Sequence, residues 1–322
     1  MNKLLIISLL VITITVFITC SDEKLENIKI YGLEGKFAYY SYKIFNELAT
    51  SPLWYYDGKS IIFAYWVAKP PVCFDIYSID NEGGNLTYLT SGEYGFLSDI
   101  SSDGYILLFN SFEYSMNDSP IYYFKPGSEP ILSELKGSEP TIYGSIYQKY
   151  NIAYLYDNDN DEGNGWSIYL SDINCSKPEE IRSNGYYSRP DFNSIGDLLL
   201  YVKYREYPIE EVNPCDLCIY DMNKCEEKVI YSSNYDIHHQ PFSPDGNLIT
   251  FSMSGYDFNN KTEASLWLIH TYGGKPWIAI NYPYKSLGSY AGIARPSWSP
   301  DGKWIVYWIA CEDELWKVRV FE

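Results

Sequence analysis

The stretch that decides the fold reads Arg295-Pro-Ser-Trp-Ser-Pro-Asp-Gly-Lys-Trp-Ile-Val-Tyr307 and lies near the C-terminus. A second copy, Gln240-Pro-Phe-Ser-Pro-Asp-Gly-Asn-Leu-Ile-Thr-Phe251, precedes it. The Asp-Gly pair that both copies share supplies a positive φ for a tight hairpin. The residues before the pair alternate in polarity, which predicts an inner strand. The apolar run after the pair predicts a second strand that is buried on both faces.

Weaker copies of this pattern recur along the chain. They cover residues 51–63, 97–109, 139–154 and 189–201. The second turn positions are 58, 104, 149, 196, 246 and 302, so neighbouring copies are 45 to 56 residues apart. This period is typical of one four-stranded propeller blade per repeat.

Third and fourth strands follow in several copies. Third strands are expected at residues 75–79, 167–170, 217–220 and 265–269, and fourth strands at 86–90 and 277–280. We therefore expect an all-β fold, namely a six-bladed β-propeller of four-stranded antiparallel blades. The last copy stops after a third strand at 315–320, and an open outer strand would leave backbone groups unpaired. We expect the N-terminal residues 43–48 to complete that blade and close the ring.

The repeat also carries a family resemblance. A Ser-Pro-Asp-Gly turn followed by an apolar, aromatic-rich strand resembles the repeats of TolB-like six-bladed propellers, over residues 43–322. The resemblance implies a periplasmic or surface protein that binds protein partners through the propeller. Similar repeats form the noncatalytic half of prolyl oligopeptidase relatives. We expect no hydrolase domain here, because the sequence has no Gly-x-Ser-x-Gly elbow.

Composition supports strands and excludes one class of partner. Aromatic residues make up 18% of the chain, with 34 Tyr and 9 Trp, and aromatic side chains favour half-buried pleated surfaces. The formal net charge is −18, so the surface repels phosphate backbones and nucleic acid is not an expected partner. The charge itself fits either plain solubility or a role in cation binding.

The N-terminus predicts export and membrane attachment. Lys3 precedes an apolar run over residues 4–18, and Cys20 follows just before a polar stretch. This layout predicts a signal peptide, and a Cys at the cleavage point resembles a bacterial lipobox, in which the Cys is acylated. The alternative is an ordinary signal peptide with a coincidental Cys. We expect residues 1–20 to be a lipoprotein signal, 21–42 a linker and N-terminal extension, and 43–322 the propeller, lipid-anchored in the cell envelope.

Six further cysteines leave their redox state open. They are Cys73, Cys175, Cys215, Cys218, Cys225 and Cys311. Export permits disulfides. The Cys215-x-x-Cys218 pair with Cys225 suggests a zinc site but lacks a fourth ligand at proper spacing, so a local disulfide or buried free thiols are the other interpretations.

Acidic loops are expected on the face where the inner strands begin. The most regular is Asp157-x-Asp159-x-Asp161, whose alternating carboxylates could wrap one Ca²⁺, although the spacing departs from an EF-hand loop. A plain solvated loop is the alternative. Other acidic residues expected on this face are Glu206, Glu210, Glu211, Asp216, Asp257, Glu312, Asp313 and Glu314.

A set of polar residues is expected to ring the mouth of the central channel. Each lies near the start of an inner strand: Glu139, Arg189, His238, His239, Gln240 and Arg295. Histidines and a Gln on a propeller axis resemble the metal site of oligogalacturonate lyases, but that family needs more histidines than this chain has. A capping or channel-lining pair is the alternative, and the charged members could bind a polar ligand or neutralise one another.

These features favour a noncatalytic binding propeller. We expect it to engage a protein or a polysaccharide through its acidic, aromatic-rich loop face, as a monomer or as part of an envelope complex. The alternatives are a propeller enzyme, a lyase or hydrolase with its site at the channel mouth, and a purely structural subunit of an envelope complex.

Overall fold

Antiparallel strands make up most of the chain that the computed structural model describes, which is residues 28–31, 39–46, 48–67, 73–110, 119–156, 166–175, 177–205, 213–254, 264–282, 293–310 and 312–320. One short 3₁₀ helix, η1 (Gly92–Tyr94), interrupts the described strands. The strands are β1 (Ile28–Tyr31), β2 (Tyr39–Phe45), β3 (Ala49–Trp54), β4 (Ser60–Val67), β5 (Cys73–Asp80), β6 (Thr87–Thr90), β7 (Phe96–Ile100), β8 (Ile106–Phe109), β9 (Pro120–Phe124), β10 (Ile131–Lys136), β11 (Ser138–Ile142), β12 (Ile152–Tyr156), β13 (Trp166–Ser171), β14 (Glu179–Phe192), β15 (Leu198–Tyr204), β16 (Cys215–Asp221), β17 (Glu226–Ser233), β18 (Asp236–His238), β19 (Leu248–Ser254), β20 (Ala264–His270), β21 (Trp277–Tyr282), β22 (Ile293–Trp298), β23 (Trp304–Ile309) and β24 (Glu314–Arg319).

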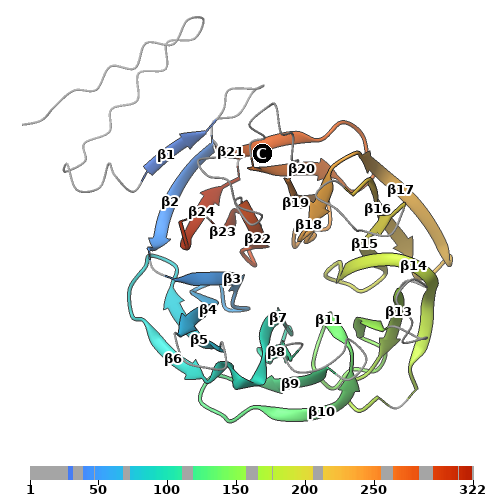
Figure 1. Ribbon diagram of the computed structural model, residues 1–322, viewed down its shortest axis with the longest axis horizontal. Helices are drawn as coiled ribbons and strands as arrows, with labels where there is room; N and C mark the ends of the chain where they lie inside the picture. The colour runs from blue at the N-terminus through green and yellow to red at the C-terminus, as the bar shows by residue number, and fades with distance from the viewer. Residues whose placement is uncertain are drawn as a thin grey trace, which may run out of the picture.

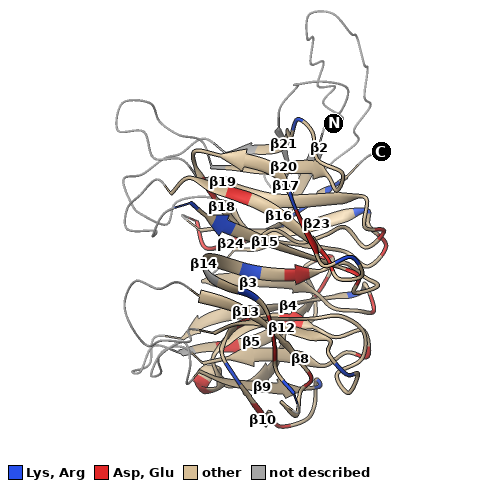
Figure 2. Ribbon diagram, turned by 90° about the vertical axis from the view of Figure 1, so that its right-hand side faces the viewer, with Lys and Arg blue, Asp and Glu red and all other residues tan. Residues whose placement is uncertain are grey.

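The strands form a β-propeller (Figure 1). Five hydrogen-bonded sheets surround a central axis: β3 to β6, β7 to β10, β11 to β17, β18 to β21, and one in the order β1-β2-β24-β23-β22. The seven-stranded sheet is continuous because β14 pairs with β13 through its first half and with β15 through its second. Seen from the side, the strands stack as a thick disc (Figure 2). The expected all-β propeller is therefore confirmed.

The Asp-Gly turns connect the innermost strand of a sheet to the next one. In the last copy the Gly302 amide donates to the Ser299 carbonyl at 2.8 Å, and Gly302 has φ 70. The Ser299 hydroxyl donates to Asp301 at 2.6 Å and accepts from the Trp304 amide at 2.9 Å, so the side chain of the first turn residue ties both ends together. The same backbone bond recurs at Gly246.

The strands after these turns are buried on both faces, as expected. Ile61, Ile62 and Phe63 are at most 1% exposed, and Leu199 and Leu200 are fully buried. Such strands lose all contact with water because neighbouring sheets cover both sides. The expected third strands coincide with β5, β13, β16, β20 and β24, and the expected fourth strands with β6 and β21.

The expected closing segment is placed differently in the structure. The strand beside β24 is β2, which starts at Tyr39 and ends at Phe45, with Lys43 opposite Trp316. The expected residues 43–48 overlap only its end, because Leu48 adopts φ 38 where the chain turns into β3. β1 pairs with the outer side of β2, so part of the expected linker at 21–42 is strand.

The cysteine expectations are partly corrected. Cys175, Cys215, Cys218 and Cys225 are free. Cys215 and Cys218 lie three residues apart on β16 and pack into different core clusters, so neither a disulfide between them nor a shared metal fits. Burial raises the pKa of both thiols to about 12, which makes them inert core residues. Cys311 lies outside the described residues, as does the side chain of Cys73.

None of the described residues forms a helix long and apolar enough to cross a membrane.

Candidate functional site

The inner strands share an unusual backbone feature where they enter the channel. Each of five equivalent positions holds a non-glycine residue in the left-handed region: Ser51 (φ 53), Glu139 (φ 49), Arg189 (φ 49), His239 (φ 52) and Arg295 (φ 50). Four of the five sit within β-bulges of the inner strand. A left-handed non-glycine residue costs on the order of 1 kcal/mol, and bulges of this kind re-aim side chains. The left-handed backbone, together with a bulge at four of the positions, brings all five residues into the wall of one cavity.

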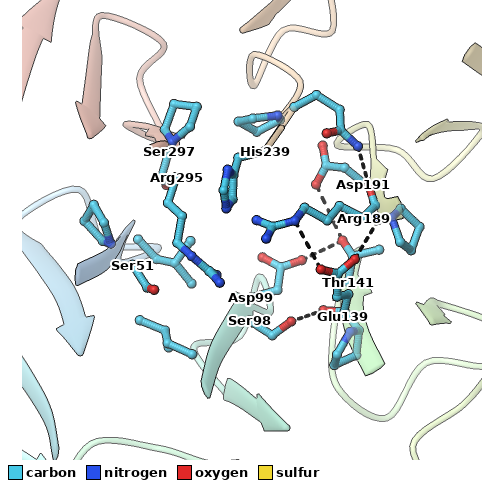
Figure 3. Close-up of a pocket in the computed structure, with 18 of the residues that line it drawn as sticks. Ser51, Ser98, Asp99, Glu139, Thr141, Arg189, Asp191, His239, Arg295 and Ser297 are labelled. Carbon is cyan, nitrogen blue, oxygen red and sulfur yellow. Dashed lines mark hydrogen bonds and ion pairs between the residues drawn. The ribbon is translucent and has the colours of Figure 1, made fainter. Parts of the chain in front are cut away.

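A cavity of about 160 Å³ lies at this level of the channel. Its wall includes five of the six residues expected at the channel mouth: Glu139, Arg189, His239, Gln240 and Arg295. Figure 3 shows Arg189, Arg295 and His239 pointing into the same space from three different strand segments. We call this space the channel cavity, and the face on which it opens the mouth face. The opposite face, which carries the Asp-Gly turns, is the turn face.

Arg189 and Glu139 form a two-point contact between neighbouring parts of the ring. Arg189 Nε lies 3.1 Å from Glu139 Oε1, and the Arg189 backbone amide donates to Glu139 Oε2 at 2.8 Å. The Gln240 side-chain amide donates to the carbonyl of Arg189. These contacts hold both bulges in place and neutralise one of the two guanidinium groups.

Arg295 is the second guanidinium of the channel cavity. No described residue is recorded in a hydrogen bond or ion pair with it. Burial, followed by the like charge of Arg189, lowers the pKa of Arg295 to about 9, against an opposing effect of Glu139. The group therefore still carries its positive charge at neutral pH.

His239 and Gln240 contribute polar atoms that have no partner in the described structure. Both ring nitrogens of His239 and the side-chain oxygen of Gln240 are buried and unpaired. Matching the two strongest copies of the repeat by sequence places Gln240 opposite Arg295. In the structure the left-handed residue equivalent to Arg295 is His239, so the alignment of these copies shifts by one residue. Counting back from the Asp-Gly turn, rather than matching the two prolines, gives the correct alignment.

His238 does not line the channel cavity. Its Nε2 lies 3.9 Å from Asp236 Oδ2, and its side chain is 33% exposed. Burial and the charge of Arg189 lower the pKa of His238 to about 4, while burial raises the pKa of Asp236. Because the imidazole is neutral at pH 7, this contact is not an ion pair.

A second group of cavity residues was missed by the sequence comparison. Thr141 and Asp191 each lie two positions after the left-handed residue of their copies, and Asp99 directly follows the bulge at Ser98. All three line the cavity (Figure 3). Asp99 Oδ2 accepts from the Thr141 hydroxyl at 2.7 Å and from the Ile142 amide at 2.8 Å, and Asp191 Oδ2 accepts from the Phe242 amide at 2.9 Å. These carboxylates join one repeat to the next. Aligning the copies on their turns would have revealed them.

Asp191 makes the stability of the fold depend on pH. Burial, and then the nearby charge of Asp99, raises the pKa of Asp191 well above its usual value. The native state therefore binds this proton more tightly than the unfolded state does, so this contribution to stability is present at low pH and is lost as pH rises through the native pKa. Asp191→Asn keeps an acceptor for the Phe242 amide and removes the ionisation. We expect the variant to gain on the order of 1 kcal/mol relative to wild type between acidic and neutral pH.

Urea unfolding at several pH values measures this effect. Asp191→Ala is the matched comparison, because it leaves the Phe242 amide without an acceptor and should cost about 1–3 kcal/mol at every pH. If the unfolding free energies of wild type and Asp191→Asn change with pH in parallel, the pKa of Asp191 is not raised in the folded protein.

The remaining predicted residues are placed as follows. Cys20 and the expected calcium ligands Asp157, Asp159 and Asp161 lie outside the described residues. So do Glu206, Glu210, Glu211 and Asp257 of the acidic face. Two described members of that face have cationic partners: Asp216 lies 2.6 Å from Arg205, and Glu314 lies 2.6 Å from Lys43. Within the described residues, no group of three or more His, Cys, Asp or Glu could hold a metal ion.

Solved β-propellers resemble this chain along most of its length. A candidate TolB from Agrobacterium tumefaciens is 18% identical with a TM-score of 0.58, and the match covers 86% of this chain and 91% of that one. TolB from Acinetobacter baumannii is 16% identical with a TM-score of 0.57, over 82% of this chain and 64% of that one. The fold is that of the TolB-like propellers.

Enzymes share this TolB-like fold. An oligogalacturonate lyase from Vibrio parahaemolyticus is 11% identical with a TM-score of 0.59, over 92% of this chain and 97% of that one. Identities this low show the fold alone. No protein-family model matches the sequence, and no curated protein matches it.

Proposed function

We propose that this protein is a noncatalytic binding propeller that engages a protein or polysaccharide partner on its mouth face. The observation that carries the proposal is the set of five left-handed residues that turn polar side chains into one cavity. Backbone strain repeated at equivalent positions persists only where the surrounding structure enforces it, and it is concentrated at functional sites. The acidic loops expected on this face would add contacts around the rim.

We further propose that the sheets make up six blades and that β2 closes the ring. Among the described residues, six hydrophobic clusters lie between neighbouring sheets or half-sheets. One cluster joins Ile44, Phe63 and Leu315, which come from the two ends of the chain. The Trp54 amide also donates to the Ser297 hydroxyl at 3.0 Å, across the same boundary. Counting β14 in two blades gives six.

Attachment to the cell envelope through an acylated Cys20 belongs to the same proposal, and it rests on the N-terminal sequence. Replacing Cys20 with Ser should release the protein from membranes in cell fractionation. A Cys20→Ser variant that stays membrane-bound until detergent is added would contradict acylation.

The binding function is tested by capture from solubilised envelopes of the bacterium that makes the protein. Ser98 lies in the wall of the channel cavity, so Ser98→Trp should block it. Ile195 is 70% exposed at a turn on the opposite face, so Ile195→Trp is a matched control. We expect wild type and Ile195→Trp to capture the same partner and Ser98→Trp to lose it. Equal capture by all three would contradict a site at the mouth.

An enzyme with its site at the channel mouth is the second candidate. The unpaired ring nitrogens of His239 favour it, because an imidazole in a cavity can move a proton. Incubation with oligogalacturonates and with sugar lactones, with and without added divalent metal, tests this candidate. Turnover that disappears in His239→Asn would replace the binding proposal with an enzymatic one.

A further inference from the structure

The charges of the channel cavity are not balanced pair by pair. Arg189 is held by Glu139 through two contacts, while the guanidinium of Arg295 has no recorded partner among the described residues. Figure 3 shows both guanidinium groups directed into the same space. Two like charges in a poorly solvated wall repel each other unless an anion lies between them.

The fixed carboxylates of the wall are already engaged elsewhere. Asp99 accepts hydrogen bonds from Thr141 and from the amides of Ile100 and Ile142, and Asp191 accepts from the amide of Phe242. These bonds hold the two carboxylates against the neighbouring repeat. Among the described residues, the cavity wall therefore has a guanidinium without a recorded partner, that of Arg295, while its carboxylates already accept hydrogen bonds or form an ion pair.

His239 has unmet hydrogen-bonding capacity at the same place. Both of its ring nitrogens are buried without a partner. An imidazole carries at least one N–H donor in either protonation state, and leaving both ring nitrogens unpaired in a buried position is unfavourable. A bound group with lone pairs would satisfy the donor.

We propose that the channel cavity binds a single carboxylate group, held by the guanidinium groups of Arg295 and Arg189 with an N–H of His239 as a further contact. A guanidinium presents a planar fork of donors that matches the two oxygens of a carboxylate. This inference rests on the proposed binding function and names its ligand class. The cavity volume of about 160 Å³ is enough for a chain terminus or one acidic sugar ring to enter partway.

The charge of the whole chain restricts this ligand to one carboxylate. A net charge of −18 repels a polyanion on approach. A single carboxylate meets much weaker repulsion, and the guanidinium groups of the cavity attract it. A polyuronate would have to place its other carboxylates near that negative surface. The site thus selects the acidic end of a partner rather than a polyanionic chain.

Titration calorimetry on the purified full chain tests the proposal with four probes. These are an N-acetylated alanine tripeptide with a free carboxylate, the same tripeptide amidated, glucuronate, and trigalacturonate. We expect the free acid or glucuronate to bind, and removal of the carboxylate by amidation to weaken peptide binding by about tenfold or more. The comparison of acid with amide uses wild-type protein, so it does not depend on the folding of any variant.

Two arginine variants locate the site. Arg295→Gln should weaken carboxylate binding by about tenfold or more. Arg205→Gln is the matched control, because Arg205 pairs with Asp216 away from the cavity, and it should bind as wild type does. Thermal unfolding of both variants shows whether they are folded.

Each outcome decides the proposal. Binding of the peptide acid alone assigns a polypeptide terminus, and binding of glucuronate alone assigns a sugar carboxylate. Equal binding of acid and amide, no binding of any probe, or trigalacturonate binding about tenfold more tightly than glucuronate would overturn it. If envelope capture succeeds but acid and amide bind equally, the ligand class is wrong while the binding function stands.

Discussion

Deletion of β2, residues 39–45, is expected to abolish cooperative unfolding of the propeller. β2 covers the outer edge of β24, and its Ile44 side chain is 7% exposed in a cluster with Leu315 and Val306. Without β2, the hydrogen-bonding groups of β24 face solvent and this cluster opens. Loss of the Ile44 contacts alone costs about 2–5 kcal/mol, a large part of the stability of a typical domain.

Thermal and urea unfolding followed by circular dichroism measure this effect. Deletion of β1, residues 28–31, is the matched control, because β1 pairs only with the outer side of β2 in the described structure. We expect the β1 deletion to unfold close to wild type. A β2 deletion that unfolds at the wild-type midpoint with the same cooperativity would show that β2 does not close the ring.

Replacement of Trp316 by Ala should be the most damaging single change in the core. Trp316 is fully buried on β24, and its indole N–H donates to Glu314 at 2.8 Å. Its cluster includes Tyr307 and Ile305 of the neighbouring strand. Removing so large a side chain leaves a cavity, and the expected loss is about 3–5 kcal/mol of unfolding free energy.

Trp66→Ala provides the comparison for this change. Trp66 is 45% exposed at the end of β4, so its replacement should cost less than about 1 kcal/mol. The two variants are compared by their urea midpoints. This comparison requires that the slope of the unfolding free energy against urea concentration is the same in both variants. Similar losses of unfolding free energy in both variants would contradict the close packing of Trp316 in its cluster.

The strand pattern could be predicted because it depends on local chemistry. Glycines at 246 and 302 have the positive φ that the Asp-Gly motif predicts, and the apolar runs after the turns are the buried second strands. The start of β2 could not be predicted, because its position is set by pairing with β24 at the other end of the chain. The aromatic residues at 39–42 favour a strand, but nothing local shows which strand they pair with.

Part of the wall of the channel cavity could be predicted from the sequence. Reading the entry of each inner strand identified Glu139, Arg189 and Arg295, and the structure brings them to one cavity. The bulges could not be foreseen, because a left-handed Arg or Glu contradicts local preference and is imposed by the surrounding strands. The equivalence of His239, rather than Gln240, with Arg295 could have been found from the sequence, by counting back from the Asp-Gly turns.

The roles of Asp99 and Asp191 depend on neighbours far away in the sequence. Each accepts a backbone N–H from the following repeat, at Ile142 and Phe242. An isolated Asp in a strand gives no sign of such a bond. Comparing the repeats position by position would have marked both residues as unusual, since the other copies hold uncharged residues there.

Hydroxyl-radical footprinting of the protein with its captured partner tests the central claim, that the partner binds on the mouth face, most directly. Three residues near the mouth face are well exposed and report on it: Leu48 (40%), Trp66 (45%) and Tyr235 (43%). Three residues of the turn face serve as the internal control: Tyr147 (60%), Ile195 (70%) and Tyr272 (72%). We expect the partner to slow oxidation of the first three residues and to leave oxidation of the other three unchanged. Protection of the turn-face residues with full oxidation at the mouth would contradict it.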